Sequence, residues 1–319
     1  MGKVIEITRR SIHAFFQSYH SFASTAALLV FPVSAATLLS HSLTLSSSPI
    51  LRTISSRLRL LFEAAGFPAT SQFFSLLNFR LSQAILTFIS TLPFTLVFLI
   101  LAKASVIQII WEFPRCRLAP PPFSSLLHLY PSLLLSHLSN SLAILSVNAV
   151  IFSILLLAFN AVDILHLSSS NSMLLLSATS AILYSMVNAN AMVACNLAIV
   201  ISATENNGGY LSILKALVLI RGRTATAITL ALPASLGMAA VEALFQCRVM
   251  RPYHLSGKSN PSVIWEASLI TYIYSLLVVL DTIVTCMFLK SCKMGGGSHW
   301  HEYDYQTDSE PEAKGALQA

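Results

Sequence analysis

The chain has 319 residues, of which 55% are hydrophobic and only 10% are charged. Soluble domains carry about 25% charged residues, so this composition excludes an ordinary soluble protein and predicts a bilayer around the apolar surface. The formal net charge is +6 although the segment after Met294 is acidic. A basic excess beside apolar blocks is typical of helix flanks that face anionic lipid, so the expected partner is the lipid bilayer and no nucleic acid is expected.

The chain begins with a polar, amphipathic segment over 1–20, followed by an apolar block at about 21–40. This arrangement favours a retained signal-anchor over a cleaved signal peptide, because the leader is long and many apolar blocks follow. A transit peptide is the weaker alternative. In the next, mixed stretch at 44–82, the apolar residues of 51–61 fall on one helical face, and Arg52, Arg59 and Glu63 lie away from it. That pattern predicts a helix lying in the membrane interface.

Five further apolar blocks predict five more membrane-spanning helices, at about 83–102 (or on to 111), 132–160, 172–203, 224–245 and 263–289. Lys103 lies inside the longer version of the second block, and we expect its amine to snorkel to a membrane boundary. The fourth block is longer than a straight span needs, so it must tilt, kink or project.

The sequence therefore predicts an all-α integral membrane helical bundle with about six transmembrane helices plus interfacial amphipathic helices. The transmembrane domain covers 21–293, after the N-terminal segment 1–20 and before a disordered acidic tail at 294–319. Six spans place both ends of the chain on one side, where eleven Lys and Arg lie against seven on the other, which favours cytosolic ends. The basic 51–61 helix falls on the opposite side and conflicts with that orientation.

A polar stripe runs down the fourth predicted span. At about 100° per residue, one face carries Ser177, Tyr184, Asn188, Cys195 and Ser202, with Ser185 and Asn196 beside it. Side chains of this kind form hydrogen bonds between helices in membranes. The alternative is the wall of a substrate or ion path, for which Asn188 and Asn196 are the candidate residues.

Asp281 completes the candidate intramembrane polar site. It lies well inside the sixth predicted span, eight residues before Leu289. An intramembrane carboxylate is costly and marks a functional site by default. The alternative is a protonated or hydroxyl-bonded Asp that locks the sixth helix to the fourth.

Small residues recur every four positions in the fifth predicted span, at Ala227, Ala231, Ser235, Ala239 and Ala243. That spacing lets another helix backbone come close and predicts a packing seam. Glu242, near the end of the same span, is expected to reach toward Arg248.

The sequence matches none of the motifs for catalysis or metal binding that we compared with it. Gly257-Lys258-Ser259 resembles the end of a P-loop, but Pro252 stands where the first glycine must be. His299 and His301 are two imidazoles, which do not make a metal site. The five cysteines contain no CxxC pair and predict no disulfide framework. We therefore expect a protein that is not an enzyme and that has no cofactor and no metal.

The stretch 184–223 combines the end of a long apolar helix, a polar break, a short amphipathic helix and a basic stop. Within it, the run Asn196–Ser202, Glu205, Leu214-Lys215-Ala216 and Gly222-Arg223 resemble a family of plant multi-pass transmembrane proteins, some of which are called polyadenylate-binding protein-binding proteins. The likeness covers about 130–290 and, more faintly, the N-terminal third. Cys195 is a departure, because the plant proteins usually carry a tryptophan or a similar bulky residue there.

The stretch is also similar, more loosely, to the membrane domains attached to some bacterial glycerophosphodiester phosphodiesterases. That resemblance carries over no catalytic residues, because the phosphodiester chemistry belongs to a separate soluble domain. The leading hypothesis is a plant membrane adaptor or scaffold without enzymatic activity, which presents its acidic tail to protein partners. The alternative is a small-solute or ion transporter or channel that uses Asn188, Asn196 and Asp281. The endoplasmic reticulum or plasma membrane is the expected location, with an organellar membrane as the alternative.

Overall fold

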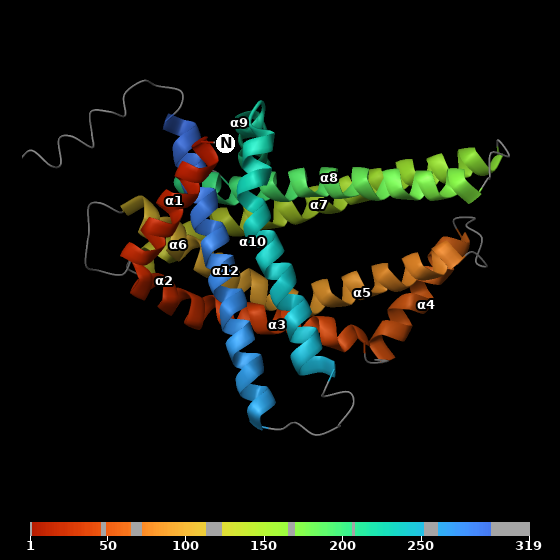
Figure 1. Cartoon of the computed structure of the whole chain (residues 1–319), viewed down its shortest axis with the longest axis horizontal. Coiled ribbons are helices and arrows are strands. Elements are labelled where there is room, and N and C mark those ends of the chain that lie inside the picture. The colour runs from red at the N-terminus through yellow and green to blue at the C-terminus, as the bar shows by residue number, and fades with distance from the viewer. Residues whose placement is uncertain are drawn as a thin grey trace, which may run out of the picture.

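The computed structural model describes residues 2–45, 49–64, 72–112, 123–164, 170–205, 208–251 and 261–294, and every element in these ranges is a helix (Figure 1). Six helical stretches are long and apolar enough to cross a membrane: Tyr19–Ser40, Leu81–Trp111, Ser124–Leu155, Ala178–Glu205, Thr224–Met250 and Ser262–Lys293. The predicted all-α architecture with six spans is confirmed. The expected disordered tail, His299 and His301 lie outside the described residues.

Three of the six stretches continue through a π-helical turn. The first joins α2 (Tyr19–Thr25), η1 (Ala26–Val30) and α3 (Phe31–Leu45), the second joins α5 (Gln72–Phe94), η2 (Thr95–Leu99) and α6 (Ile100–Glu112), and the fifth joins α10 (Thr224–Phe245) and η3 (Gln246–Met250). Pro32 and Pro93 lie within two residues of η1 and η2. A proline lacks the N–H that closes a regular turn, so wide turns near these prolines let the helices continue.

The other spans are α7 (Phe123–Ile164), α8 (Ser170–Glu205) and α12 (Pro261–Met294), and the shorter helices are α1 (Gly2–Gln17), α4 (Pro49–Ala64) and α9 (Tyr210–Ile220). Figure 1 shows α7 and α8 side by side as a long hairpin that extends out from the crossing with α10 and α12, to the same side as α4 and α5. The first half of α8 leaves apolar side chains exposed, including Leu175 and Ile182. This half of the helix therefore projects beyond the packed core, as one of the three expectations had it.

Helix α12 lies at the centre of the packing. It contacts α1, α3, α6, α8 and α10, and it runs beside α10 across the α7–α8 hairpin (Figure 1). Ile283, Cys286 and Leu289 on α12 are fully buried. The predicted N-terminal amphipathic segment forms α1, which packs against α12 and buries Ile7. The apolar core is thus built around the last span.

Helix α4 corresponds to the predicted amphipathic helix over 51–61. It packs against α5, where the Asn78 amide donates hydrogen bonds to the Ser55 hydroxyl at 3.0 Å and to the Ser55 carbonyl at 3.1 Å. Arg59 and Glu63 form an exposed ion pair at 2.9 Å. An amide contact between the two helices therefore adds to the apolar packing of α4 on the protein.

The expected small-residue seam on α10 is only partly correct. Ala227 is buried and Ala231 is half-buried, but Ser235, Ala239 and Ala243 are exposed. The buried face instead follows alternating steps of three and four residues through Ala227, Leu230 and Ala234, because a helix with 3.6 residues per turn presents such a row to the helix packed against it, here α12. Glu242 also differs from expectation. It accepts a hydrogen bond from the Tyr274 hydroxyl at 3.1 Å and makes no ion pair with Arg248.

Candidate intramembrane polar site

Three polar side chains from three different spans meet inside the apolar core. Lys103 on α6 donates a hydrogen bond from Nζ to Oδ1 of Asn196 on α8 at 3.3 Å. The Nδ2 of the same amide donates to Oδ2 of Asp281 on α12, also at 3.3 Å. The amide presents an acceptor to the ammonium and a donor to the carboxylate, which is the one orientation that suits both groups. We call Lys103, Asn196 and Asp281 the polar bridge.

The space beside the polar bridge is small. A cavity of about 20 Å³ touches Asn196 and Asp281, and its other walls are mostly apolar or small side chains from α8, α10 and α12, namely Val193, Leu197, Ala227, Leu230, Ala231, Val284, Thr285 and Phe288. A volume of this size accommodates about one water molecule. The polar groups of the bridge therefore contact each other and do not line a large cavity.

The structure brings together two of the three predicted site residues. Asn196 and Asp281 are hydrogen-bonded, whereas Asn188 lies eight residues earlier on α8, about 12 Å along the helix axis, and does not join the polar bridge. The expectation for Lys103 was wrong. Its amine does not snorkel to a membrane boundary, because Asn196 gives it a partner inside the protein.

A second polar cluster holds α7 against α8 and α9. The Ser136 hydroxyl donates to Ser202 at 2.8 Å and lies 3.2 Å from the Ser212 hydroxyl, while Ser132 lies 3.1 Å from Ser202. All four serines are buried or half-buried. We call these residues the serine cluster; it satisfies hydroxyls that would otherwise face hydrocarbon.

The break between α8 and α9 is anchored to the same cluster. The Gly209 backbone N–H donates to the Ser136 hydroxyl at 2.9 Å, and Gly209 has a positive φ of 88° that a side chain would strain. Beside it, a β-carbon on Gly208 would lie 2.7 Å from the Ser132 carbonyl oxygen. The polar break predicted within 184–223 is therefore a glycine turn that lies directly on the backbone of α7.

Asn140 extends the contact between α7 and α8. Its Nδ2 donates to the Cys195 carbonyl at 2.8 Å, and its Oδ1 is buried without a hydrogen-bond partner among the described residues. The Cys195 thiol lies 4.0 Å from the Asn140 carbonyl, so the stripe residues Cys195 and Ser202 both contact α7 through their side chains. The partners on α7 were not predicted, although Ser132, Ser136 and Asn140 recur every four residues in the sequence and could have indicated the facing stripe.

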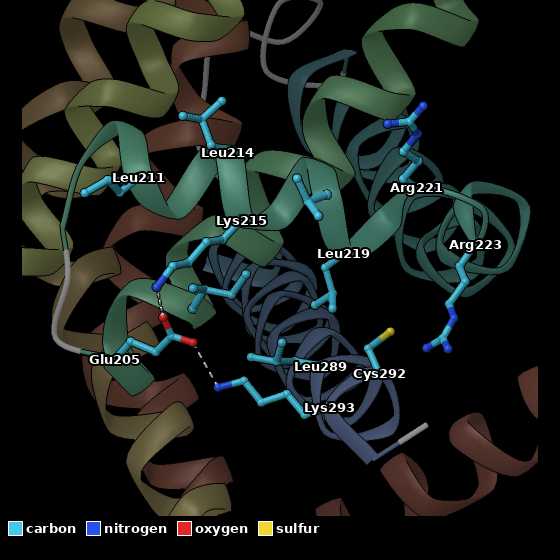
Figure 2. A pocket seen from close by; sticks show the side chains of 12 residues that line it. Glu205, Leu211, Leu214, Lys215, Leu219, Arg221, Arg223, Leu289, Cys292 and Lys293 are labelled. Carbon is cyan, nitrogen blue, oxygen red and sulfur yellow. Dashed lines mark hydrogen bonds and ion pairs between the residues drawn. The ribbon is translucent and has the colours of Figure 1, made fainter. Parts of the chain in front are cut away.

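An ion cluster lies beside α9, where the three spans that contain α6, α8 and α12 end. Glu205 at the end of α8 pairs with Lys215 on α9 at 2.5 Å and with Lys293 on α12 at 3.2 Å (Figure 2). Trp111, at the end of α6, lies under the ammonium groups of Lys290 and Lys293, at 5.6 Å and 6.0 Å from the ring centroid. Tryptophan and lysine at helix ends are typical of the membrane–water boundary.

Six apolar helices, with polar contacts between them and basic, tryptophan-bearing ends, define a multi-pass integral membrane protein. The chain belongs to the family described as a domain of unknown function, DUF8558, whose model matches residues 2–303. The match covers the six spans and extends into the acidic tail. No curated protein and no solved structure matches the chain.

Proposed function

We propose that the protein is a membrane scaffold without enzymatic activity, in which the six spans form a fixed platform and the acidic tail binds protein partners. The observation that supports this function is the closure of the polar bridge. Lys103 and Asp281 each form a hydrogen bond with Asn196, and the adjoining space is only about 20 Å³. A group of this kind ties α6, α8 and α12 together and leaves little room for a substrate.

The projecting α7–α8 hairpin also suits a scaffold. Its outer part exposes apolar side chains such as Leu157, Leu175 and Ile182, each about two-thirds exposed or more. Inside a bilayer such a surface faces lipid or another membrane helix. A platform with this arm offers partners a lateral surface in addition to the tail.

The proposed setting follows the resemblance described above. We place the scaffold in a plant cell, in the endoplasmic reticulum or the plasma membrane, with the acidic tail in the cytosol. Basic residues gathered at one end of the spans, including Lys215, Arg223 and Lys293, support a cytosolic position for that end.

The scaffold is tested by the proteins that co-purify, in mild detergent, with the full chain and with a chain ending at Lys293. We expect stoichiometric partners on the full chain and their loss from the shortened one. A matched variant keeps the tail length but neutralises its five acids (Glu302, Asp304, Asp308, Glu310 and Glu312, each changed to its amide). Its partners should be lost as well if charge is what they recognise. Identical partner sets for all three proteins would contradict the scaffold.

A transporter or channel is the second candidate, and one observation favours it. The polar bridge sets a potential cation, Lys103, and a potential anion, Asp281, on either side of an amide within the spans. Intramembrane ionisable groups of this kind line ion and proton paths in other proteins. This function predicts a pH-dependent flux in liposomes that Asp281→Asn abolishes while the protein stays folded. Absence of flux with both forms would remove its support.

A further inference from the structure

A pocket lies at the basic end of the spans, away from the polar bridge. Its volume is about 570 Å³, and α8, α9, α12 and the turn before α10 form its walls (Figure 2). Four cations line it (Lys215, Arg221, Arg223 and Lys293), together with one carboxylate, Glu205. The pocket therefore carries a net positive charge.

The single carboxylate leaves part of this charge unneutralised. Glu205 is occupied by Lys215 and Lys293. Arg221 and Arg223 make no ion pair with any carboxylate in the described ranges. Figure 2 shows Arg223 pointing back toward Cys292 and Lys293. Guanidinium groups bind phosphate through paired N–H donors, so the pocket suits an anionic phosphate group.

A glycine turn sets the two arginines in place. Residues 221–223 form a turn between α9 and α10 in which Gly222 has a φ of 82°, a conformation that L side chains rarely adopt. The backbone N–H of Arg223 closes this turn by donating to the Ile220 carbonyl at 2.7 Å. Both arginines are exposed, so their side chains can reach a ligand from outside the protein.

The other walls of the pocket are apolar and continue onto an exposed surface. Leu211, Leu214 and Val218 on α9 line the pocket and are 61%, 55% and 74% exposed. A soluble anion has no apolar part that could cover such a surface, whereas an acyl chain can pack along it. The pocket lies at the ends of α8 and α12, at the start of α10 and near Trp111, and span ends with tryptophan are typical of the membrane boundary.

We propose that this pocket binds an anionic phospholipid, with the phosphate on Arg223 and Lys293 and an acyl chain along Leu214 and Val218 of α9. Arg221 adds to the positive field at the rim of the pocket. The site would give the basic end of the protein a preference for an anionic leaflet. This inference does not depend on the scaffold function.

The test counts lipids retained by the delipidated full chain, using native mass spectrometry with phosphatidylglycerol and phosphatidylcholine as the probes. We expect the wild type to prefer phosphatidylglycerol. In the double variant Arg223→Gln/Lys293→Gln that preference should fall about tenfold, because each basic residue near an anionic headgroup contributes to the free energy of binding the lipid. The matched control Arg248→Gln/Arg251→Gln removes the same charge at the far end of the α10–η3 stretch and should leave the preference unchanged.

A second variant guards against a folding defect. Val218→Gln changes an exposed side chain, so the melting temperature should hold while phosphatidylglycerol retention drops. Equal retention by the wild type and both pocket variants would overturn the proposal. A competition experiment with glycerol 3-phosphate tests whether the pocket instead binds a soluble phosphate. If it displaces the lipid at equal concentration, the pocket is a site for soluble phosphates and the lipid assignment is wrong.

Discussion

Lys103 and Asp281 are linked through the Asn196 amide and not by direct contact. Each of the two hydrogen bonds measures 3.3 Å, and no direct ion pair within 4.0 Å joins the ammonium and the carboxylate. Helices α6, α8 and α12 are therefore held by one side chain that serves as both acceptor and donor. Several expectations depend on this relationship.

Replacing the bridging amide should destabilise the protein. Asn196→Ala leaves both Lys103 and Asp281 without a partner, and an unsatisfied buried polar group costs about 1–3 kcal/mol. The measurement is the melting temperature in detergent. Asn190→Ala is the control, because Asn190 is on the same helix and bonds only the Met186 carbonyl within its own helix. A melting temperature of Asn196→Ala equal to that of the control would show that the bridge contributes nothing to stability.

The two charged ends of the bridge should be strongly non-additive. Lys103→Met leaves Asp281 without a nearby cation, and Asp281→Leu leaves Lys103 without a nearby anion. Each single change should therefore lower the stability of the protein. The double variant removes both charges together and should be more stable than the sum of the two singles predicts, by about 0.5–3 kcal/mol. Denaturant titrations of the four proteins complete the cycle. Simple additivity would mean that the two residues act independently.

The spans were predictable from the sequence, but the partners inside them were not. Blocks of about 20 apolar residues are a local signal, which is why all six appear near their expected positions. The partner of Lys103 depends on contacts between residues 93 positions apart, which no local pattern contains. The expectation of a lysine at a boundary assumed that no acceptor lay within the core, and Asn196 provides one. The fourth and sixth spans are joined at Asp281 by the Asn196–Asp281 hydrogen bond, with an amide where a hydroxyl was expected, and the structural role of this contact stays a prediction.

Helix faces were harder to predict than helix positions. On α10 the four-residue repeat of small side chains suggested the contact face, yet Ser235, Ala239 and Ala243 are exposed. The actual face depends on where α12 crosses and on which apolar side chains fill the gap. On α8 the stripe did identify the side chains of Cys195 and Ser202 correctly as contacts, because α7 carries a matching polar face.

The glycine turn on α7 should be intolerant of a methyl group. Gly208→Ala would place its β-carbon 2.7 Å from the Ser132 carbonyl oxygen, which is backbone and cannot rotate away. The overpacking should lower stability by about 1–3 kcal/mol. Gly237→Ala is the matched control, because its β-carbon would meet only the flexible end of Leu277 at 3.3 Å. Equal melting temperatures for the two variants would contradict the close packing of Gly208.

The serine cluster should contribute measurably through Ser202. This hydroxyl lies between Ser132 and Ser136, so Ser202→Ala removes hydrogen bonds to both. Hydrogen bonds between membrane helices contribute about 0.6 kcal/mol on average and up to about 1.7 kcal/mol. Thermal unfolding should show a loss in that range. Ser235→Ala, which removes only an exposed bond to the Ala231 carbonyl, should leave stability unchanged, and an equal loss there would contradict the assignment.

The central claim is that the polar bridge is a structural lock and not part of an ion path. The most direct measurement is the decay of a pH gradient in liposomes that contain either the wild type or the Lys103→Met/Asp281→Leu double variant, followed with an enclosed pH-sensitive dye. If the bridge is a lock, both proteins dissipate the gradient at the same rate. A faster decay with the wild type, lost in a double variant that remains folded, would contradict the scaffold and identify the bridge as a proton path.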